Sequence, residues 1–238
     1  MTEDTTAGGI LAFATGFNTP GKHDATGAFQ PMADRFVRYH GGSVVLFDDR
    51  QPMHERAGEV LEAIERYEGH ARLVCVAFFC HGWSRGIEAG FDLRARVGVS
   101  PRVLAEALAQ RAGRGLIVPL YCCSTGRTPG VPTAEAHEAP GGDGGFADEL
   151  RDELCRAGLT NCRVDAHDRD GHTTWNPYVR RFDGEGSPVG GVGGRYLVRA
   201  GGPTWTRWKH ELKSGSLWAR YPFYSTGALA ATLAPPTV

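Results

Sequence analysis

Two residues that could take part in nucleophilic chemistry, His81 and Cys123, each follow a run of hydrophobic residues. His81-Gly82 follows the run 73–80, and Cys123 lies just beyond the run 116–121. A continuous apolar run is typical of a strand that is covered on both faces in a parallel sheet. The carboxyl ends of such strands border the reactive crevice of α/β proteins. We therefore expect the thiol and the imidazole to lie together, as a cysteine nucleophile and the group that takes or holds its proton.

The residues that follow Cys123 favour chemistry over simple packing. A cysteine after a strand is usually a packing residue, because cysteine is among the most frequently buried residue types. Here Ser-Thr-Gly follows at 124–126, a sharp exit that could expose the side chain and direct backbone N–H groups at a developing oxyanion. A glycine directly after His81 lets the backbone turn tightly and lets a substrate approach. The pair is more informative than either residue alone.

Alternating strand and helix signals predict the framework that positions this pair. The predicted strands cover residues 10–14, 44–47, 73–80, 116–121, 162–166 and 195–198. The predicted helices begin near Pro31, Met53, Pro101 (after an N-cap at Ser100), Asp143 (as an N-cap) and Thr204. Such β-α-β alternation predicts a parallel sheet with helices on both faces.

This order of elements indicates one α/β domain, a three-layer α-β-α sandwich around a mostly parallel sheet, that spans residues 1–238. Its predicted core is 10–166, and 167–238 is a loop-rich extension packed on that core. Residues 124–145 are rich in Gly, Pro, Thr and Ala and lack helical or strand periodicity. They predict a mobile surface loop.

Composition narrows the possible partners and compartments. A formal net charge of −1 gives no electrostatic reason to expect a nucleic acid or an anionic membrane as partner. We expect neither a signal peptide nor a membrane span. The six cysteines are interpreted as reduced thiols of a cytoplasmic protein. The sequence contains no CxxC pair, so a structural zinc site of that type is not expected. No cofactor is expected.

Three segments together resemble the clan CD cysteine peptidases, which include caspases, metacaspases, gingipains, separases and bacterial CHAT domains. Their signature is a hydrophobic strand that ends in His-Gly, then a helix, then a hydrophobic strand that ends in the nucleophilic cysteine. The matching segments are Val-Ala-Phe-Phe-Cys-His-Gly at 76–82, the helical stretch 99–108, and Leu-Ile-Val-Pro-Leu-Tyr-Cys-Cys-Ser-Thr-Gly at 116–126. Counting back from Gly126 selects Cys123 rather than Cys122. The resemblance covers roughly residues 10 to 165 and implies a caspase-like sheet.

The resemblance also implies a mechanism, which is acyl transfer through a Cys-His dyad. Cys123 attacks a peptide carbonyl, His81 acts as acid and base, and backbone N–H groups near Gly82 and Cys123 stabilise the oxyanion. Phe79-Cys80 stands where many relatives have Ser-Gly. The arginines with which caspases bind an acidic residue have no match here, so cleavage specificity does not carry over. The loop 124–145 occupies the place of the caspase activation linker, which makes it a candidate regulatory segment.

Two alternatives compete with the peptidase interpretation. Gly82-Trp-Ser84-Arg-Gly86 matches the G-x-S-x-G nucleophile elbow of α/β-hydrolases, with Asp143 or Asp165 and His172 as possible partners. That interpretation requires a helix directly after the motif, but the following residues have only a weak helical period. The third possibility is a non-catalytic caspase-like module that acts by binding a partner.

A cluster of acidic and histidine residues at 165–172 has several interpretations. Two histidines, His167 and His172, and three aspartates within eight positions could bind a divalent metal. We favour a strand-end loop whose aspartates form Asx-turns. Because this loop follows a predicted strand at the same edge as Cys123, Asp165 or Asp168 could instead receive a basic side chain of a substrate.

Overall fold

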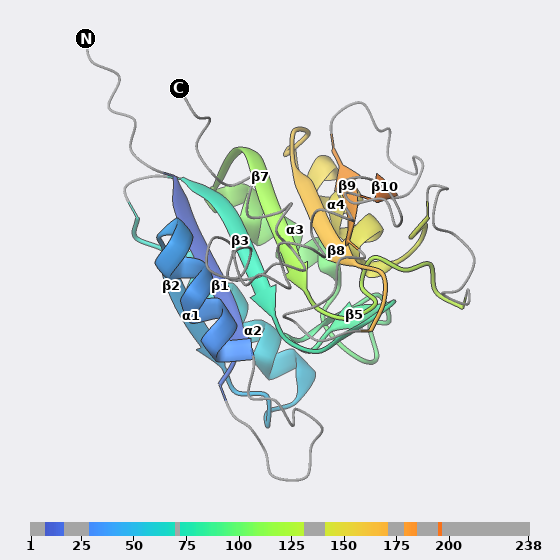
Figure 1. Cartoon of the computed structure of the whole chain (residues 1–238), viewed down its shortest axis with the longest axis horizontal. Coiled ribbons are helices and arrows are strands. Elements are labelled where there is room, and N and C mark those ends of the chain that lie inside the picture. Colours follow the sequence, from blue (N-terminus) through green and yellow to red (C-terminus); the bar gives the residue numbers. More distant parts are fainter. Residues whose placement is uncertain are drawn as a thin grey trace, which may run out of the picture.

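The computed structural model describes residues 8–16, 29–69, 72–130, 141–170, 179–184 and 195–196. A central sheet of seven strands lies in the middle of this part of the chain (Figure 1). Its strands are β1 (Gly9–Thr15), β2 (Ser43–Phe47), β3 (Leu73–Phe79), β7 (Ala112–Tyr121), β8 (Arg163–His167), β9 (Val179–Asp183) and β10 (Arg195–Tyr196). Their order across the sheet is β10-β9-β8-β7-β3-β1-β2. Five of these strands, β2, β1, β3, β7 and β8, run parallel to one another. The predicted, mostly parallel sheet is therefore confirmed.

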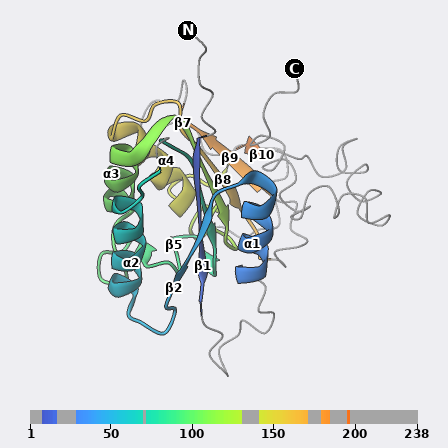
Figure 2. The ribbon, with the colours of Figure 1, turned by 90° about the vertical axis from the view of Figure 1, so that its left-hand side faces the viewer.

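Helices cover both faces of this sheet, as the β-α-β alternation predicts (Figure 2). They are α1 (Phe29–His40), α2 (Met53–Glu65), α3 (Pro101–Arg111) and α4 (Phe146–Arg156). Helix α1 lies on one face, and α2, α3 and α4 lie side by side on the other. The described part of the chain thus has an α/β architecture with a helical layer on each side of the sheet.

The uninterrupted hydrophobic run of β3 follows from this double cover. Val76, Phe78 and Cys80 belong to the core cluster that includes α2, α3 and α4. Cys75 and Phe79, which alternate with them, belong to the cluster that includes α1. All of these side chains are fully buried. Successive strand residues point to opposite faces, so a strand with helices on both sides needs apolar residues at every position.

The helix-start signal before α3 is confirmed, whereas the one before α4 is wrong. Ser100 caps α3, because its hydroxyl accepts a hydrogen bond from the N–H of Arg102 at 3.3 Å. The N-cap of α4 is Gly145, not Asp143, and no side chain caps it. Asp148 in the first turn accepts a hydrogen bond from the N–H of Gly144 at 3.0 Å. An acidic residue of the helix itself therefore binds the backbone at this end.

A small antiparallel sheet follows β3 directly. Its strands are β4 (Gly82–Trp83), β5 (Gly86–Ile87) and β6 (Phe91–Asp92). The indole N–H of Trp83 donates to Asp92 at 2.6 Å, and Arg94 forms an ion pair with the same buried carboxylate at 2.8 Å. These polar contacts fix the segment that follows His81.

The antiparallel end of the sheet corrects a sequence prediction. Residues 167–238 are expected to form a loop-rich extension, yet β9 lies within it and pairs antiparallel with β8. Strand β10 pairs antiparallel with β9, at the start of the predicted strand 195–198. The charged sequence Val-Arg-Arg-Phe-Asp of β9 lacks the apolar run that marks the parallel strands. Predictions for residues 131–140 and for the helix from Thr204 onward fall outside the described residues.

The helices of the structure can be compared with the requirements of a membrane-spanning segment. Within the described ranges, none of them combines the length and the apolar character that crossing a bilayer requires.

Candidate active site

The register between β3 and β7 brings His81 and Cys123 to the same edge of the sheet. Phe79 pairs with Tyr121 as the two parallel strands end. One residue further, the sulfur atoms of Cys80 and Cys122 lie 3.5 Å apart. His81 and Cys123 are the next residues of the two chains, where both leave the sheet. Strand pairing thus accounts for the position of the two residues at neighbouring strand ends.

Gly82 shows how closely the two segments approach. A Cβ at this position would lie 2.7 Å from Cβ of Cys122, 2.8 Å from the carbonyl oxygen of Cys123 and 2.8 Å from Cγ2 of Thr125. These distances are shorter than any normal contact, so a side chain has no room. The segment His81-Gly82 therefore packs its backbone directly against the Cys122–Thr125 turn, and glycine is required for this approach.

The two adjacent cysteines have different surroundings. Cys122 is completely buried, and its thiol contacts Cys80 and the carbonyl oxygen of Phe78 at 3.5 Å. Burial, followed by the hydrogen bond with Cys80, raises the pKa of the Cys122 thiol well above its usual range. Cys123 is only partly buried. A thiol must ionise and reach a substrate to act as a nucleophile, so Cys123 is the better candidate of the two.

The turn after Cys123 has an unusual backbone. Ser124 has a φ of 58°, and it is the one non-glycine residue with positive φ in the described part of the chain. Its hydroxyl donates to the carboxylate of Asp170 at 2.6 Å, and the hydroxyl of Thr125 donates to the carbonyl oxygen of Cys122 at 3.0 Å. Backbone strain of this kind clusters at functional sites, where surrounding contacts must maintain it. Here those contacts fix the exit from β7 next to Cys123.

The N-terminus of α4 joins the two loops of the site. The N–H of Ala147 donates to the carbonyl oxygen of Thr125 at 3.1 Å, and the N–H of Phe146 donates to that of Ser84 at 2.9 Å. The first backbone N–H groups of a helix have no partner within the helix, so here two of them hold the turn after Cys123 and the hairpin after His81. One helix end thereby fixes the relative position of both segments.

Two residues that sequence reasoning missed lie against His81. The ring of Phe29, in the first turn of α1, packs edge-on against the imidazole with centroids 5.0 Å apart. Glu88 accepts a hydrogen bond from the N–H of His81 at 3.2 Å, and its own N–H donates to the carbonyl oxygen of His81 at 2.9 Å. Phe29 is remote in sequence and belongs to no motif. Glu88 is seven positions from His81, a spacing that no familiar catalytic pattern marks.

Asp165 and Asp168, the proposed contacts for a basic substrate group, are buried in internal ion pairs. Asp165 is fully buried and bonds to Arg181 at 2.9 Å and to Arg163 at 3.2 Å. Burial raises the pKa of Asp165, and the neighbouring arginines oppose that shift. Asp168 bonds to Arg180 at 3.3 Å. Because β9 supplies Arg180 and Arg181 and was not predicted, this internal pairing was missed. The geometry does not support the predicted substrate contacts.

The alternative nucleophile, Ser84, lacks the backbone context of a nucleophile elbow. It lies in the tight turn between the antiparallel strands β4 and β5, and a third short strand follows. The elbow requires a strand, a sharp turn and then a helix that begins at once. His172, the histidine of this hypothesis, lies outside the described residues, as does any metal site that would include it. Among the residues described, no three potential ligands are grouped to hold a metal ion.

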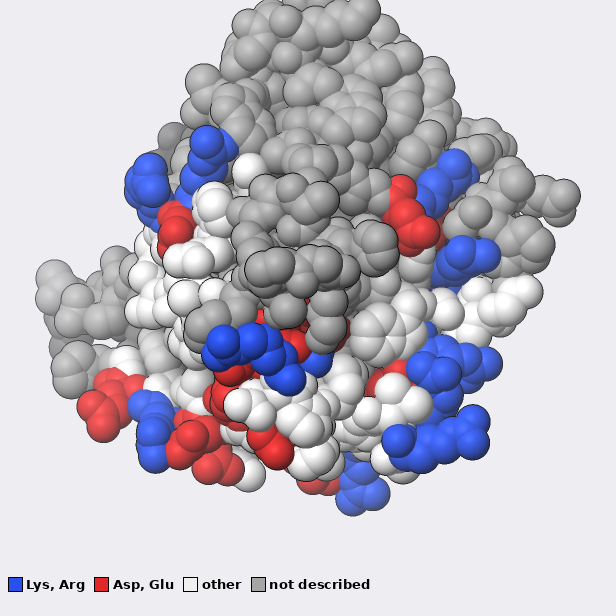
Figure 3. All heavy atoms as spheres, turned by 90° about the horizontal axis from the view of Figure 1, so that it is seen from below, with Lys and Arg blue, Asp and Glu red and all other residues white. Residues whose placement is uncertain are grey.

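Charge on the face at the carboxyl ends of the parallel strands is mixed rather than of one sign. Figure 3 shows this face from below, with basic side chains gathered toward the right-hand edge and acidic ones more frequent toward the left. The described residues that can be seen on this face form no single broad basic patch of the kind that binds nucleic acid phosphates.

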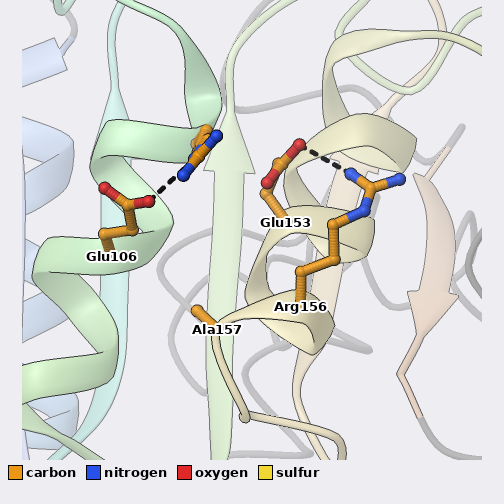
Figure 4. Close-up of a pocket in the computed structure, with 5 residues that line it drawn as sticks. Glu106, Glu153, Arg156 and Ala157 are labelled. Carbon is orange, nitrogen blue, oxygen red and sulfur yellow. Dashed lines mark hydrogen bonds and ion pairs between the residues drawn. The ribbon is translucent and has the colours of Figure 1, made fainter.

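A groove of about 490 Å³ lies apart from these residues, between α3 and α4 (Figure 4). Its charged side chains pair within each helix, Arg102 with Glu106 at 2.8 Å and Arg156 with Glu153 at 2.6 Å. The groove contains no nucleophile and neither His81 nor Cys123, so it adds nothing to the chemistry of the strand ends.

Comparison with known proteins assigns no family. No protein-family model matches the chain, and no curated protein matches it significantly. The functional argument therefore depends on the geometry of the site.

Proposed function

We propose that this protein is a caspase-like cysteine endopeptidase that cleaves a protein or peptide substrate through a Cys123–His81 dyad. The observation that carries the proposal is the close packing of the His81-Gly82 segment against the Cys122–Thr125 turn. His81 and Cys123 follow the paired strand ends of β3 and β7, and the backbone at Gly82 is in close contact with the Cys122–Thr125 turn. A thiol and an imidazole at one strand-end crevice are the groups that covalent acyl transfer needs.

Each residue has a defined role in the proposed reaction. Cys123 attacks the peptide carbonyl, and His81 delivers a proton to the leaving amine. Water then hydrolyses the thioester and releases the acid product. Backbone N–H groups near Gly82 and Cys123 stabilise the tetrahedral oxyanion. The strained turn at Ser124 supports this assignment, because its contacts fix the backbone that follows the nucleophile.

The arrangement of elements supports the caspase-like part of the proposal. The His-Gly strand, the intervening helix and the cysteine strand of the resemblance correspond to β3, α3 and β7. The substrate and any regulatory partner are proteins or peptides, and residues 124–145 are the candidate regulatory segment. We retain the cytoplasm as the proposed location. All six cysteines lie in the described part of the chain and are free there.

The test is site-by-site labelling of the folded protein with iodoacetamide at about pH 6.5, where ordinary thiols are mostly protonated. Mass spectrometry measures the rate at each cysteine. We expect Cys123 to react faster than Cys122, which is an internal control on the same strand end, and we expect His81→Ala to slow Cys123. Hydrolysis of a fluorogenic peptide library should then be lost in Cys123→Ala and retained in Ser84→Ala.

The opposite results would remove the proposal. Equal, slow labelling of Cys123 in the wild type and in His81→Ala would show that no reactive dyad exists. Hydrolysis lost in Ser84→Ala but retained in Cys123→Ala would indicate a serine hydrolase. A protein that neither labels selectively nor hydrolyses any library member would be assigned to the non-catalytic binding class.

A further inference from the structure

The thiols of Cys155 and Cys162 lie together at the end of the sheet remote from the candidate active site. Cys155 is in the last turn of α4, and Cys162 directly precedes β8. Between them the chain turns back, because the N–H of Leu159 donates to the carbonyl oxygen of Leu154 at 2.9 Å. The two sulfur atoms are 4.0 Å apart. A disulfide bond is about 2.05 Å long, so an approach of about 2 Å would join them.

Gly184, directly after β9, provides the space that both sulfur atoms share. Its N–H donates to the carbonyl oxygen of Cys162 at 2.8 Å, which continues the antiparallel pairing of β8 with β9. A Cβ at this position would lie 2.9 Å from Sγ of Cys162 and 3.0 Å from Sγ of Cys155. Any larger residue would press on both sulfur atoms. Glycine therefore lets the two thiols point to the same place beside one stretch of backbone.

The two thiols differ in their access to solvent. Cys155 is partly exposed, whereas Cys162 is only 2% exposed. Burial raises the pKa of the Cys155 thiol, and the hydrogen bond with Cys162 and the charge of Arg151 oppose that shift. Burial raises the pKa of the Cys162 thiol well above its usual range. A dissolved reagent therefore meets Cys155 first, and Cys162 is reached through Cys155.

We propose that Cys155 and Cys162 form a site of oxidative modification, at which a small-molecule disulfide converts the two thiols into one intramolecular disulfide bond. The Cys155 thiolate attacks one sulfur of the reagent and releases one reagent thiol, which leaves a mixed disulfide on Cys155. The Cys162 thiolate then attacks the sulfur of Cys155 and releases the second reagent thiol. The two protons and two electrons that the protein loses end on the two reagent thiols.

Proximity alone does not select this pair. The sulfur atoms of Cys80 and Cys122 are closer, at 3.5 Å, yet both residues are fully buried. A cysteine must ionise and be accessible to react with an oxidant, so the folded protein shields this second pair. Cys80 and Cys122 are therefore a matched control for Cys155 and Cys162. The reaction does not depend on the proposed peptidase activity.

The test exposes the folded full chain to hydroxyethyl disulfide, a small uncharged disulfide, at about pH 8, where a larger fraction of a thiol is ionised. Iodoacetamide then blocks the remaining thiols, and trypsin digests the protein. Cleavage after arginine puts the two cysteines in separate peptides, Asp-Glu-Leu-Cys-Arg at 152–156 and Ala-Gly-Leu-Thr-Asn-Cys-Arg at 157–163. Mass spectrometry therefore identifies their disulfide directly. We expect this bond to form at least about tenfold faster than a bond between Cys80 and Cys122.

Two substitutions test the order of attack. In Cys162→Ser the reaction should stop at a mixed disulfide on Cys155, because no second thiol displaces the reagent. In Cys155→Ser the buried Cys162 should stay unmodified over the same time. Modification of Cys162 in that variant at the wild-type rate would contradict the assignment of Cys155 as the attacking thiol.

The wild-type protein alone decides the proposal if either variant fails to fold. A bond between Cys155 and Cys162 that forms only in urea, or no faster than one between Cys80 and Cys122, would show reaction through the unfolded chain and overturn it. A wild-type protein that keeps both thiols free, or that accumulates the mixed disulfide without linkage, would overturn it equally. A mixed disulfide on Cys123 bears only on the peptidase proposal.

Discussion

At the scale of single residues, the candidate site depends on the close contact of the Gly82 backbone with the turn that follows β7. Gly82 lies against Cys122, Cys123 and Thr125 at distances that exclude a Cβ. In contrast, a Cβ at Gly58 in α2 would have no atom within 4 Å apart from its chain neighbours and the backbone of its own helix. The two glycines therefore differ in what an added methyl group must displace.

This contrast gives a matched pair of substitutions. We expect Gly82→Ala to lower the free energy of unfolding by roughly 1–3 kcal/mol, because the added methyl group overpacks the contact. It should also slow Cys123 labelling by about tenfold to a hundredfold, since the two segments must move apart. Gly58→Ala should raise stability by about 0.5–1 kcal/mol, as expected for alanine in an exposed helix. Urea unfolding and labelling of both variants provide the measurement. Similar behaviour of the two would contradict the close approach.

At the scale of elements, an ion pair connects the antiparallel strand β9 to the parallel part of the sheet. Asp165 and Arg181 are directly opposite each other in β8 and β9. Two nitrogen atoms of the guanidinium bind the two carboxylate oxygens, at 2.9 and 3.3 Å. Asp165 is fully buried, so its charge depends on Arg181 and Arg163 for compensation.

Removing one partner should therefore be costly. We expect Arg181→Met to reduce the free energy of unfolding by roughly 3 kcal/mol, because the buried carboxylate of Asp165 then keeps only one of its two arginine partners. The pKa of Asp165 should rise further in this variant. Arg102→Met removes an ion pair that is exposed on α3 and should cost less than about 1 kcal/mol. Chemical denaturation of both proteins tests the comparison, and equal losses would show that the β8–β9 pair contributes no more than a surface pair.

At the scale of the whole molecule, helical layers on both faces bury titratable groups of both signs. Burial lowers the pKa of His40, at the end of α1, from 6.5 to about 4. Burial raises the pKa of Glu88 and of Asp148, which lie on the other side of the sheet or at its end. These shifts have opposite consequences for stability as the pH falls.

The His40 contribution can be isolated by substitution. Between pH 6.5 and about 4 the unfolded chain binds a proton at His40 that the folded protein does not bind. Stability is therefore lost as the pH falls through this range. Glu88 and Asp148 act in the opposite direction, because their folded forms hold protons more tightly. We expect the wild type to lose on the order of 1 kcal/mol relative to His40→Gln between pH 7 and pH 4.5, because partial exposure of the ring reduces the full effect. Urea midpoints at several pH values measure the difference, and a constant difference would contradict the burial of His40.

Several features of the fold follow from local sequence alone. The apolar runs of β3 and β7 mark strands that are covered on both faces, and Ser100 with Pro101 marks the start of α3. These signals work because each depends on a few neighbouring residues. Strand β9 escaped prediction because its arginines find their partners on β8 and on the residue after it. Nothing in the sequence of β9 itself shows that its arginines form ion pairs with Asp165 and Asp168.

In the candidate site, too, some features follow from local sequence and others depend on the tertiary structure. The sequence determined the two chemical groups, Cys123 and His81, and the strand ends that carry them, because residue type and the end of an apolar run are local properties. Only the tertiary structure decided that Cys122 is buried against Cys80, that Gly82 must be a glycine, and that Glu88 and Phe29 lie against His81. The burial and electrostatic environment of a residue depend on segments that pack against it from elsewhere in the chain, and local sequence does not encode which segments those are.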